Sequence, residues 1–338
     1  MRATVAAIEY HFPERCLTNA QLAEEFPEWS VEKIEEKTGI AERWIAAEDE
    51  CSSDLGIVAA QKLFSSGVCQ PADVDYILFC TQSPDYFLPT TACLMQERLS
   101  IPASAGALDF NLGCSGYVYG LGLAKGLVET GQATNVLLVT AETYSKFIHP
   151  RDKSVRTIFG DAGAATLVRG VARNDECVGP FVYGTDGCGA PNLIVSTGGM
   201  RRRVAHEGEQ AIMDSDNNLR SEVSLYMNGP EIFAFALRVV PKVVQELLAR
   251  AAKESGDVDL YVFHQANRHM LEHLRKKLRI PADRFFVGVR HCGNTVSCTI
   301  PIALKQATEE GRIQPGHLVM LVGFGVGYSW GATLIRWL

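Results

Sequence analysis

Short apolar runs bounded by turn residues recur along the chain. They are apolar at most positions rather than at alternate ones, and they lie at residues 4–10, 76–82, 136–141, 260–264 and 318–323. Continuous apolar runs of this length are typical of strands that are covered on both faces. Residues 230–254 instead repeat Ile, Phe, Leu and Val at helical spacing. The alternation of such segments predicts an α/β layered fold.

The chain also contains an internal repeat. Residues 73–79 (DVDYILF) are echoed by residues 257–263 (DVDLYVF) at an offset of 184 positions. Two more pairs of apolar runs follow in the same order: 135–139 with 317–321, and 165–169 with 332–336. Repeated units in a fixed order indicate duplicated structural units. We therefore predict two homologous halves, residues 1–172 and 173–338.

The repeat has a geometric consequence for three polar residues. When the repeat offset is added to the position of Cys114, the result falls in the segment that begins at Asn294. We therefore expect Cys114 and Asn294 to open equivalent helices. Equivalent central helices can meet at the axis of a pseudo-twofold arrangement. His264 directly follows a repeated strand, at the carboxyl end where sites of α/β proteins usually form.

Composition and charge narrow the class of protein. Hydrophobic residues make up 47% and charged residues 21%, which is ordinary for a globular protein. The formal net charge of −7 argues against a nucleic-acid binder, because such proteins need a basic surface to neutralise phosphates. The amino-terminal segment is expected to be a strand rather than a signal peptide, and no run is long enough for a membrane helix.

Cysteine usage agrees with a cytoplasmic protein. The ten cysteines include no C-x-x-C pair and no cluster with the spacing of metal ligands, so we expect reduced thiols and no bound metal. Nine of the ten are interpreted as small buried apolar residues. Cys114 differs because it lies between an apolar strand and a glycine-rich helix.

At the start of a helix the free N–H groups and the helix dipole favour a thiolate over a thiol. This position predicts a lowered pKa and a nucleophilic sulfur at Cys114. Four glycines in the following helix, Gly116, Gly120, Gly122 and Gly126, indicate that something packs very close to it. For this segment alone, a purely structural cysteine explains the pattern equally well.

His264 and Asn294 give the thiol its chemical context. A neutral imidazole and an amide both donate hydrogen bonds to an oxygen that becomes negative in a transition state, so the pair suits an enolate. Near the end of the chain, Gly323-Phe-Gly-Val-Gly-Tyr-Ser-Trp-Gly331 forms a glycine loop after a strand. It does not spell a dinucleotide-binding pattern, and close approach of the backbone to a ligand remains its functional interpretation.

Taken together these motifs resemble the β-ketoacyl-acyl carrier protein synthase III family of thiolase-fold condensing enzymes. The resemblance covers nearly the whole chain and rests on seven motifs in register: Lys37-Thr-Gly-Ile40, Gly113-Cys-Ser-Gly116, Phe159-Gly-Asp-Ala-Gly163, Met227-Asn-Gly-Pro-Glu231, His264-Gln-Ala-Asn267, Gly293-Asn-Thr295 and the final glycine loop. It implies a thiolase-like fold of two pseudo-twofold-related halves in five layers, α-β-α-β-α.

The resemblance also implies a mechanism. Cys114 would take an acyl group from a thioester, with its own N–H and that of Val326 forming the oxyanion hole. His264 and Asn294 would then stabilise the enolate formed when a malonyl thioester loses carbon dioxide. Phe324 matches a phenylalanine that packs beside the nucleophile. No cofactor is implied, because coenzyme A and acyl carrier protein thioesters serve as substrates.

Binding residues are implied in the same way. Asn267 matches a residue near the pantetheine arm, and Lys37 and Lys153 stand where arginines often hold the coenzyme. Lys33 replaces the tryptophan that usually stacks on the adenine, so weaker stacking is expected. A basic helix face is proposed to dock an acidic carrier protein, with a solvated face as the alternative; its residues are Arg268, Arg275, Lys276 and Lys277.

Several alternatives stay open at this point. The acyl group could pass to an oxygen or nitrogen acceptor without decarboxylation, and a Cys-His-Asn thioester hydrolase is a more distant possibility. A non-enzymatic subunit is opposed by the presence of all three reactive residues. The primer and its carrier, coenzyme A or carrier protein, are not determined, nor is housekeeping fatty-acid initiation distinguished from a specialised pathway. A homodimer is implied by the family, with residues 84–89 covering the partner's pocket.

Overall fold

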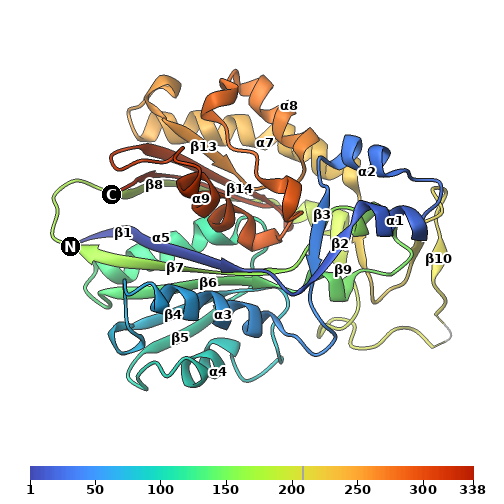
Figure 1. Ribbon diagram of the computed structural model, residues 1–338, viewed down its shortest axis with the longest axis horizontal. Helices are drawn as coiled ribbons and strands as arrows, with labels where there is room; N and C mark the ends of the chain where they lie inside the picture. The colour runs from blue at the N-terminus through green and yellow to red at the C-terminus, as the bar shows by residue number, and fades with distance from the viewer. Residues whose placement is uncertain (208) are drawn as a thin grey trace.

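The computed structural model describes residues 1–207 and 209–338. Its centre is built from two sheets that face each other across a layer of helices (Figure 1). The first sheet has five strands in the order β1 (Arg2–His11), β7 (Ala162–Val171), β6 (Asn135–Glu142), β4 (Tyr76–Cys80) and β5 (Gly106–Phe110). The second has four strands in the order β8 (Val178–Thr185), β15 (Ser329–Arg336), β14 (Leu318–Gly325) and β13 (Leu260–Phe263).

The two sheets repeat one topology. In the first, β1 runs antiparallel to β7, β7 antiparallel to β6, and β6 parallel to β4. In the second, β8 runs antiparallel to β15, β15 antiparallel to β14, and β14 parallel to β13. The three sequence echoes fall on the matching pairs β4 with β13, β6 with β14, and β7 with β15. Among the described strands β5 has no full counterpart, since at the equivalent edge Phe285 forms only an isolated parallel bridge to Tyr261 of β13. The division at residues 172 and 173 stays a prediction.

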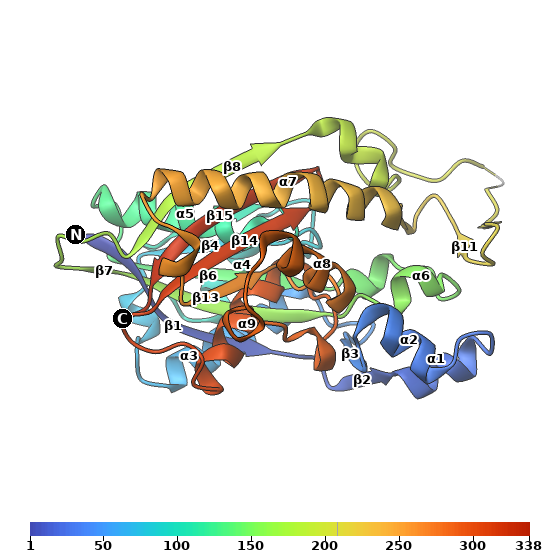
Figure 2. The ribbon, with the colours of Figure 1, turned by 90° about the horizontal axis from the view of Figure 1, so that it is seen from above.

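Helices form the other three layers, which gives the five-layered thiolase-like fold expected from the resemblance. The outer layer on the first sheet is α3 (Ser52–Ser65) and α4 (Thr91–Arg98), and that on the second is α7 (Gly229–Arg250) and α8 (Arg268–Leu278). Figure 2 shows α7 running along the outer face of the second sheet. The middle layer is α5 (Gly116–Glu129) and α9 (Thr299–Glu309).

A smaller lobe lies beside the sheets at one end (Figure 1). It contains β2 (Arg15–Thr18), α1 (Asn19–Glu25), α2 (Val31–Thr38), β3 (Glu42–Ile45), α6 (Lys153–Arg156), β9 (Leu193–Val195), β10 (Ile212–Met213), β11 (Leu219–Arg220) and β12 (Leu225–Met227). In α2 the Ser30 side chain accepts a hydrogen bond from the Lys33 N–H, and Gly39 ends the helix at φ 70°. None of the described helices is both long and apolar enough to cross a bilayer.

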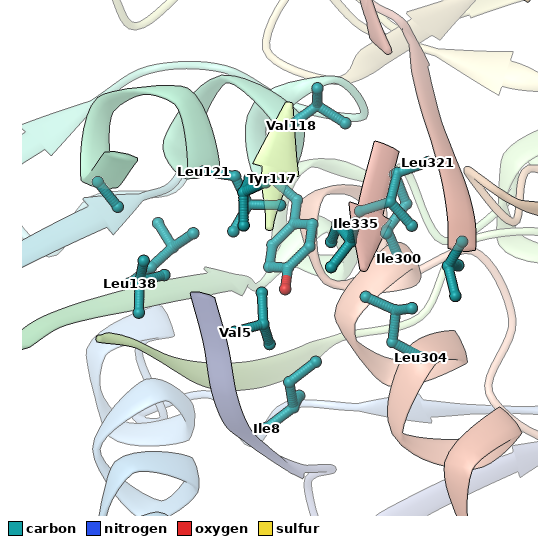
Figure 3. Close-up of a cluster of buried hydrophobic side chains, with 14 of the residues drawn as sticks. Val5, Ile8, Tyr117, Val118, Leu121, Leu138, Ile300, Leu304, Leu321 and Ile335 are labelled. Atoms are coloured by element: carbon teal, nitrogen blue, oxygen red, sulfur yellow. The ribbon is translucent and has the colours of Figure 1, made fainter. Parts of the chain in front are cut away.

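The core between the sheets is formed by α5 and α9 together with strands of both sheets. Tyr117 of α5 and Ile300 and Leu304 of α9 are fully buried and point into one shared cluster (Figure 3). Burial of this much apolar surface against both sheets is the main stabilising term of such a fold. Side chains of the two central helices therefore share one core.

Glycines in α5 allow the close packing, with one exception. A Cβ on Gly116 would lie 2.3 Å from the Cys80 sulfur, and one on Gly120 would lie 2.6 Å from Leu138. A Cβ on Gly122 would meet the Tyr183 hydroxyl of the second sheet. Gly126 has nothing within 4 Å of that position, so the expectation of a close neighbour is wrong there.

Candidate active site

Cys114 lies in the short turn between β5 and α5, and its side chain is buried. The end of β14 passes directly over it, since a Cβ on Gly325 would come within 2.7 Å of the Cys114 sulfur. A Cβ on Gly323 would be 2.8 Å from the Cys114 carbonyl oxygen. The glycine loop is thus held against the thiol, as its sequence indicated.

The protonation state of Cys114 differs from the prediction. Burial raises the pKa of the thiol to about 12, and the negative charge of Glu142 acts in the same direction. A hydrogen bond from the Val326 backbone N–H lowers the pKa but does not outweigh burial. Desolvation of the thiolate therefore dominates over the start of α5, and the free thiol is protonated at neutral pH.

His264 follows β13 and is buried at 2% exposure. Its backbone N–H donates to the Val322 carbonyl over 2.8 Å, which fixes it beside β14. Burial lowers the pKa of the imidazole to about 3, so the ring is neutral near pH 7. The Phe324 ring packs against it edge to face, with ring centroids 5.6 Å apart. A neutral imidazole is the form that the predicted role requires.

Asn294 is positioned by the first half of the chain. Its N–H donates to the Ile158 carbonyl over 2.9 Å, and its carbonyl accepts from the Gly160 N–H over 3.1 Å. Its Oδ1 accepts from the Val296 N–H over 2.9 Å, and no described residue accepts a hydrogen bond from its Nδ2. The amide donors of Asn294 are thus available to a substrate.

The segment after Asn294 corrects one detail of the prediction. Asn294 does not open α9; a 3-10 turn, η7 (Val296–Cys298), intervenes before the helix starts at Thr299. Val296 has φ 55°, which is unusual for a β-branched residue and is found mostly at functional or strained positions. The turn carries Val296 into the buried cluster that includes Cys114.

The turns that carry Cys114 and Asn294 meet at the glycine loop. A Cβ on Gly113 would lie 2.8 Å from Val326 and 3.2 Å from Val296, so the Cys114 turn, the glycine loop and the Asn294 turn converge. His264 adjoins this place through Phe324 of the same glycine loop. Cys114 follows β5 of the first sheet, and His264 follows β13 of the second.

Glu142, at the end of β6, is an acidic residue that sequence reasoning missed. It is completely buried, and it accepts hydrogen bonds from the Ser297 hydroxyl over 2.7 Å and from the Gln82 N–H over 2.9 Å. Burial raises the pKa of its carboxyl group to about 8. The available signal was a carboxylate at the end of an otherwise apolar strand, which is rare without a specific partner.

A cavity of about 800 Å³ opens beside Val326. Its inner walls are mainly apolar and include Tyr144, Phe147, Leu193, Val195 and Leu225. Residues 84–87 form part of its rim, and Phe87 and Leu88 are 77% and 80% exposed. Cys114 does not line this cavity, but it belongs to the same buried apolar cluster as Leu193 and Leu225. A largely apolar cavity of this size is a suitable site for a small hydrophobic chain.

The residues expected at a coenzyme site lie near an aromatic ring. The ring centroid of Trp29 is 4.7 Å from Lys37 Nζ and 5.4 Å from Lys33 Nζ. Lys153 is mostly buried and forms an ion pair with Glu28 at 2.5 Å. Asn267 caps α8 by accepting from the Met270 N–H over 2.8 Å. The cationic charge of Lys153 is therefore already partnered.

The proposed basic helix face is not a single face. Arg275 is paired with Glu272 at 2.8 Å and also donates to the Ile280 carbonyl, while Lys277 donates to the Leu237 carbonyl. Arg268 and Lys276 are exposed and border a second cavity together with three acidic residues of α2: Glu32, Glu35 and Glu36. Two of the four cations are thus held by local hydrogen bonds, and the other two lie beside acidic side chains that partly neutralise their charge.

Comparisons with known proteins agree with this arrangement. Residues 108–187 match the family model described as 3-oxoacyl-[acyl-carrier-protein (ACP)] synthase III, and residues 248–337 match the model of its C-terminal part. The chain is 36% identical over 327 residues to the β-ketoacyl-[acyl-carrier-protein] synthase III of Caldanaerobacter subterraneus, covering 97% of this chain and 95% of that protein. The chain belongs to the synthase III family.

Solved structures extend the likeness to three dimensions. A crystal structure of a 3-oxoacyl-(acyl-carrier-protein) synthase III is 53% identical, with a TM-score of 0.99 and complete coverage of both chains. The synthase III of Thermus thermophilus is 37% identical, with a TM-score of 0.86 and 99% coverage of each chain. The synthase III resemblance and the thiolase-like fold expected from the sequence are both confirmed.

Proposed function

We propose that this chain condenses an acyl primer, carried on Cys114, with a malonyl thioester and releases carbon dioxide. The observation that carries the proposal is the convergence of the Cys114 turn, the glycine loop and the Asn294 turn beside an apolar cavity. Membership of the synthase III family supports the same reaction. No cofactor or metal is required, because both substrates are already activated as thioesters.

In the first step the sulfur of Cys114 attacks the carbonyl carbon of the primer thioester. The negative oxygen that forms accepts hydrogen bonds from the N–H groups of Cys114 and Val326. The bond to the carrier sulfur then breaks, and the proton lost by Cys114 ends on the released carrier thiol. Because the free thiol is protonated at neutral pH, its proton has to leave within the substrate complex rather than beforehand.

In the second step the malonyl thioester loses carbon dioxide, and the electron pair of the broken bond moves into an enolate. His264 and the amide of Asn294 donate hydrogen bonds to the enolate oxygen. The enolate carbon attacks the acyl carbon on Cys114, the carbon–sulfur bond breaks, and the Cys114 sulfur regains a proton. The product is a β-keto thioester two carbons longer than the primer.

The primer carrier follows from the charged groups near Trp29. The ring of Trp29, with the ammonium groups of Lys33 and Lys37 over it, suits an adenine nucleotide. Asn267 follows His264 closely in the chain, at the start of α8, so acyl-coenzyme A is the proposed primer donor. The malonyl group is proposed to arrive on acyl carrier protein, the partner in the names of the relatives. Exposed Arg268 and Lys276 are the cations available to dock it.

A homodimer is part of the proposal. Strand β5 is the edge of the first sheet, and Leu108 on it is 43% exposed. Phe87 and Leu88 add further exposed apolar surface at the cavity rim. An unpaired edge with exposed apolar side chains is a typical surface for association, so a second copy along β5 would bury it. Residues 84–89 would then cover the partner's cavity.

Intact-protein mass spectrometry tests the function directly. The wild type is incubated with a panel of acyl groups on coenzyme A and on acyl carrier protein, and a mass gain that the Cys114→Ala variant lacks is expected. Release of carbon dioxide from malonyl-acyl carrier protein by the loaded enzyme is expected next. Acyl transfer to an alcohol or amine without this release, or hydrolysis alone, would replace the proposal by one of the alternatives. The absence of any acyl adduct would refute it.

A further inference from the structure

His264 has one hydrogen-bonding partner for its ring among residues 1–207 and 209–338. The imidazole Nδ1 lies 2.7 Å from the hydroxyl oxygen of Thr299, the first residue of α9. Both side chains are buried, at 2% and 3% exposure. Because no other described residue contacts a ring nitrogen at hydrogen-bond distance, Thr299 decides which nitrogen carries the proton.

The direction of this hydrogen bond depends on the second neighbour of the Thr299 hydroxyl. That hydroxyl also lies 3.0 Å from the Val296 carbonyl oxygen, one turn earlier in the chain. The same carbonyl already accepts the backbone N–H of Thr299. If the Thr299 hydroxyl hydrogen points toward His264, the Val296 carbonyl therefore still has a hydrogen-bond donor, the Thr299 N–H.

We propose that Thr299 is a positioning residue that donates its hydroxyl hydrogen to Nδ1 of His264 and so keeps the ring proton on Nε2. The shorter of the two contacts of the hydroxyl, 2.7 Å against 3.0 Å, is the one to the imidazole. With Nδ1 acting as acceptor, Nε2 carries hydrogen and is able to donate to a developing enolate oxygen.

The inference rests on the proposed function for its catalytic meaning, but not for its structural content. The opposite tautomer would present a lone pair at Nε2 and repel a negative oxygen. Thr299 would then matter for decarboxylation and condensation, in which His264 donates, and much less for acyl transfer to Cys114, whose oxyanion is held by backbone N–H groups. This separation between the two half-reactions is what a merely structural threonine would not produce.

Two substitutions of Thr299 form a matched pair. Thr299→Val keeps the branched shape and removes the hydroxyl, whereas Thr299→Ser keeps the hydroxyl and removes a methyl group. We expect Thr299→Val to lower the rate of malonyl decarboxylation about tenfold or more while acyl loading of Cys114 changes less than about twofold. Thr299→Ser is expected to retain most of the decarboxylation rate. Equal loss in both variants would assign Thr299 to packing and overturn the proposal.

The tautomer itself is measured by nitrogen NMR on protein labelled at its histidines. The His264→Ala variant identifies the signals of this ring among those of the eight histidines. We expect a pyridine-type Nδ1 and a protonated Nε2 in the wild type and in Thr299→Ser, and loss of that single state in Thr299→Val. A protonated Nδ1 in the wild type would overturn the proposal. This reading holds even if the wild type fails to load any acyl group, which would refute the proposed function alone.

Discussion

The carboxylate of Glu142 and the hydroxyl of Ser297 are joined by a hydrogen bond of 2.7 Å. Glu142 ends β6 in the first half of the chain, and Ser297 lies in the turn that follows Asn294. Both side chains are fully enclosed. The bond therefore ties the turn that presents Asn294 to the sheet that carries Cys114.

Removing this bond should weaken the fold. Ser297→Ala leaves one oxygen of a buried carboxyl group without its donor, which we expect to cost about 1–3 kcal/mol of unfolding free energy. Urea denaturation measures the change. Ser65→Ala is a suitable control, because its exposed hydroxyl bonds only to the Gln61 carbonyl of its own helix, and a change within about 0.5 kcal/mol is expected there. Equal stability of Ser297→Ala and the wild type would show that the bond contributes nothing.

Stability should also fall as the pH rises toward 8. The pKa of Glu142 is raised to about 8 by burial, so the folded state holds this proton more tightly than the unfolded state does. The contribution of Glu142 to the free energy of unfolding is complete below the ordinary carboxyl pKa. It is lost as the pH rises toward and through the pKa of Glu142 in the folded state. The titratable groups around it are Cys80, Cys114, Tyr144 and Cys298.

Between pH 6.5 and 8 the effect of Glu142 on stability can be measured with little contribution from two other buried titratable groups. Asp161, with its pKa raised to about 6, and His264, with its pKa lowered to about 3, complete most of their effect below this window. At about 1.36 kcal/mol per unit, a loss of about 2 kcal/mol is expected for the wild type. Glu142→Gln should show a flatter profile in urea midpoints measured across this range. An unchanged slope would mean that another group titrates.

Alkylation of Cys114 should increase with pH without levelling off. Because burial raises the pKa of the thiol to about 12, the thiolate fraction grows about tenfold per pH unit up to pH 9.5. Peptide mass mapping after iodoacetamide treatment measures the rate. Cys93, which is exposed, serves as the internal control in the same samples. A plateau for Cys114 near pH 7 would instead support the helix-lowered pKa that its position in the sequence suggested.

Gly325→Ala should abolish acyl loading while leaving the chain folded. The added methyl group would lie 2.7 Å from the Cys114 sulfur, a distance at which the thiol or the loop has to move. Loading is measured by intact mass and folding by circular dichroism. Gly126→Ala is the matched control, since nothing lies within 4 Å of its added methyl group. Alanine is also preferred by about 1 kcal/mol in a helix interior. Normal loading by Gly325→Ala would show that the loop yields easily.

Much of the framework was predictable from local pattern. The continuous apolar runs gave the buried strands, and the echo of residues 73–79 at 257–263 indicated the duplicated topology that β4 and β13 now show. Cys114, His264 and Asn294 stood out because each follows or precedes a recognisable element. These features depend on short local patterns and on their repetition along the chain, so the sequence alone carries them.

The parts that failed depend on neighbours far away in the chain. The pKa of Cys114 is set by its burial under Gly325 and by Glu142, and the charge of Lys153 is taken up by Glu28. The contact between His264 and Thr299 likewise forms only when separate segments pack together. Neither desolvation nor pairing between distant groups leaves a periodic signal that spacing would reveal.

The close passage of the Gly325 backbone over Cys114 also gives direction to whatever the sulfur carries. On that side there is no room for even one methyl group, so an attached chain has to extend away from β14. The space available beyond Val326 is bordered by Leu193 and Leu225. Replacing Leu193 or Leu225 by a smaller residue should therefore admit a longer primer, and replacing either by a larger residue should restrict the enzyme to a shorter one. Larger residues on the glycine side would only block the sulfur.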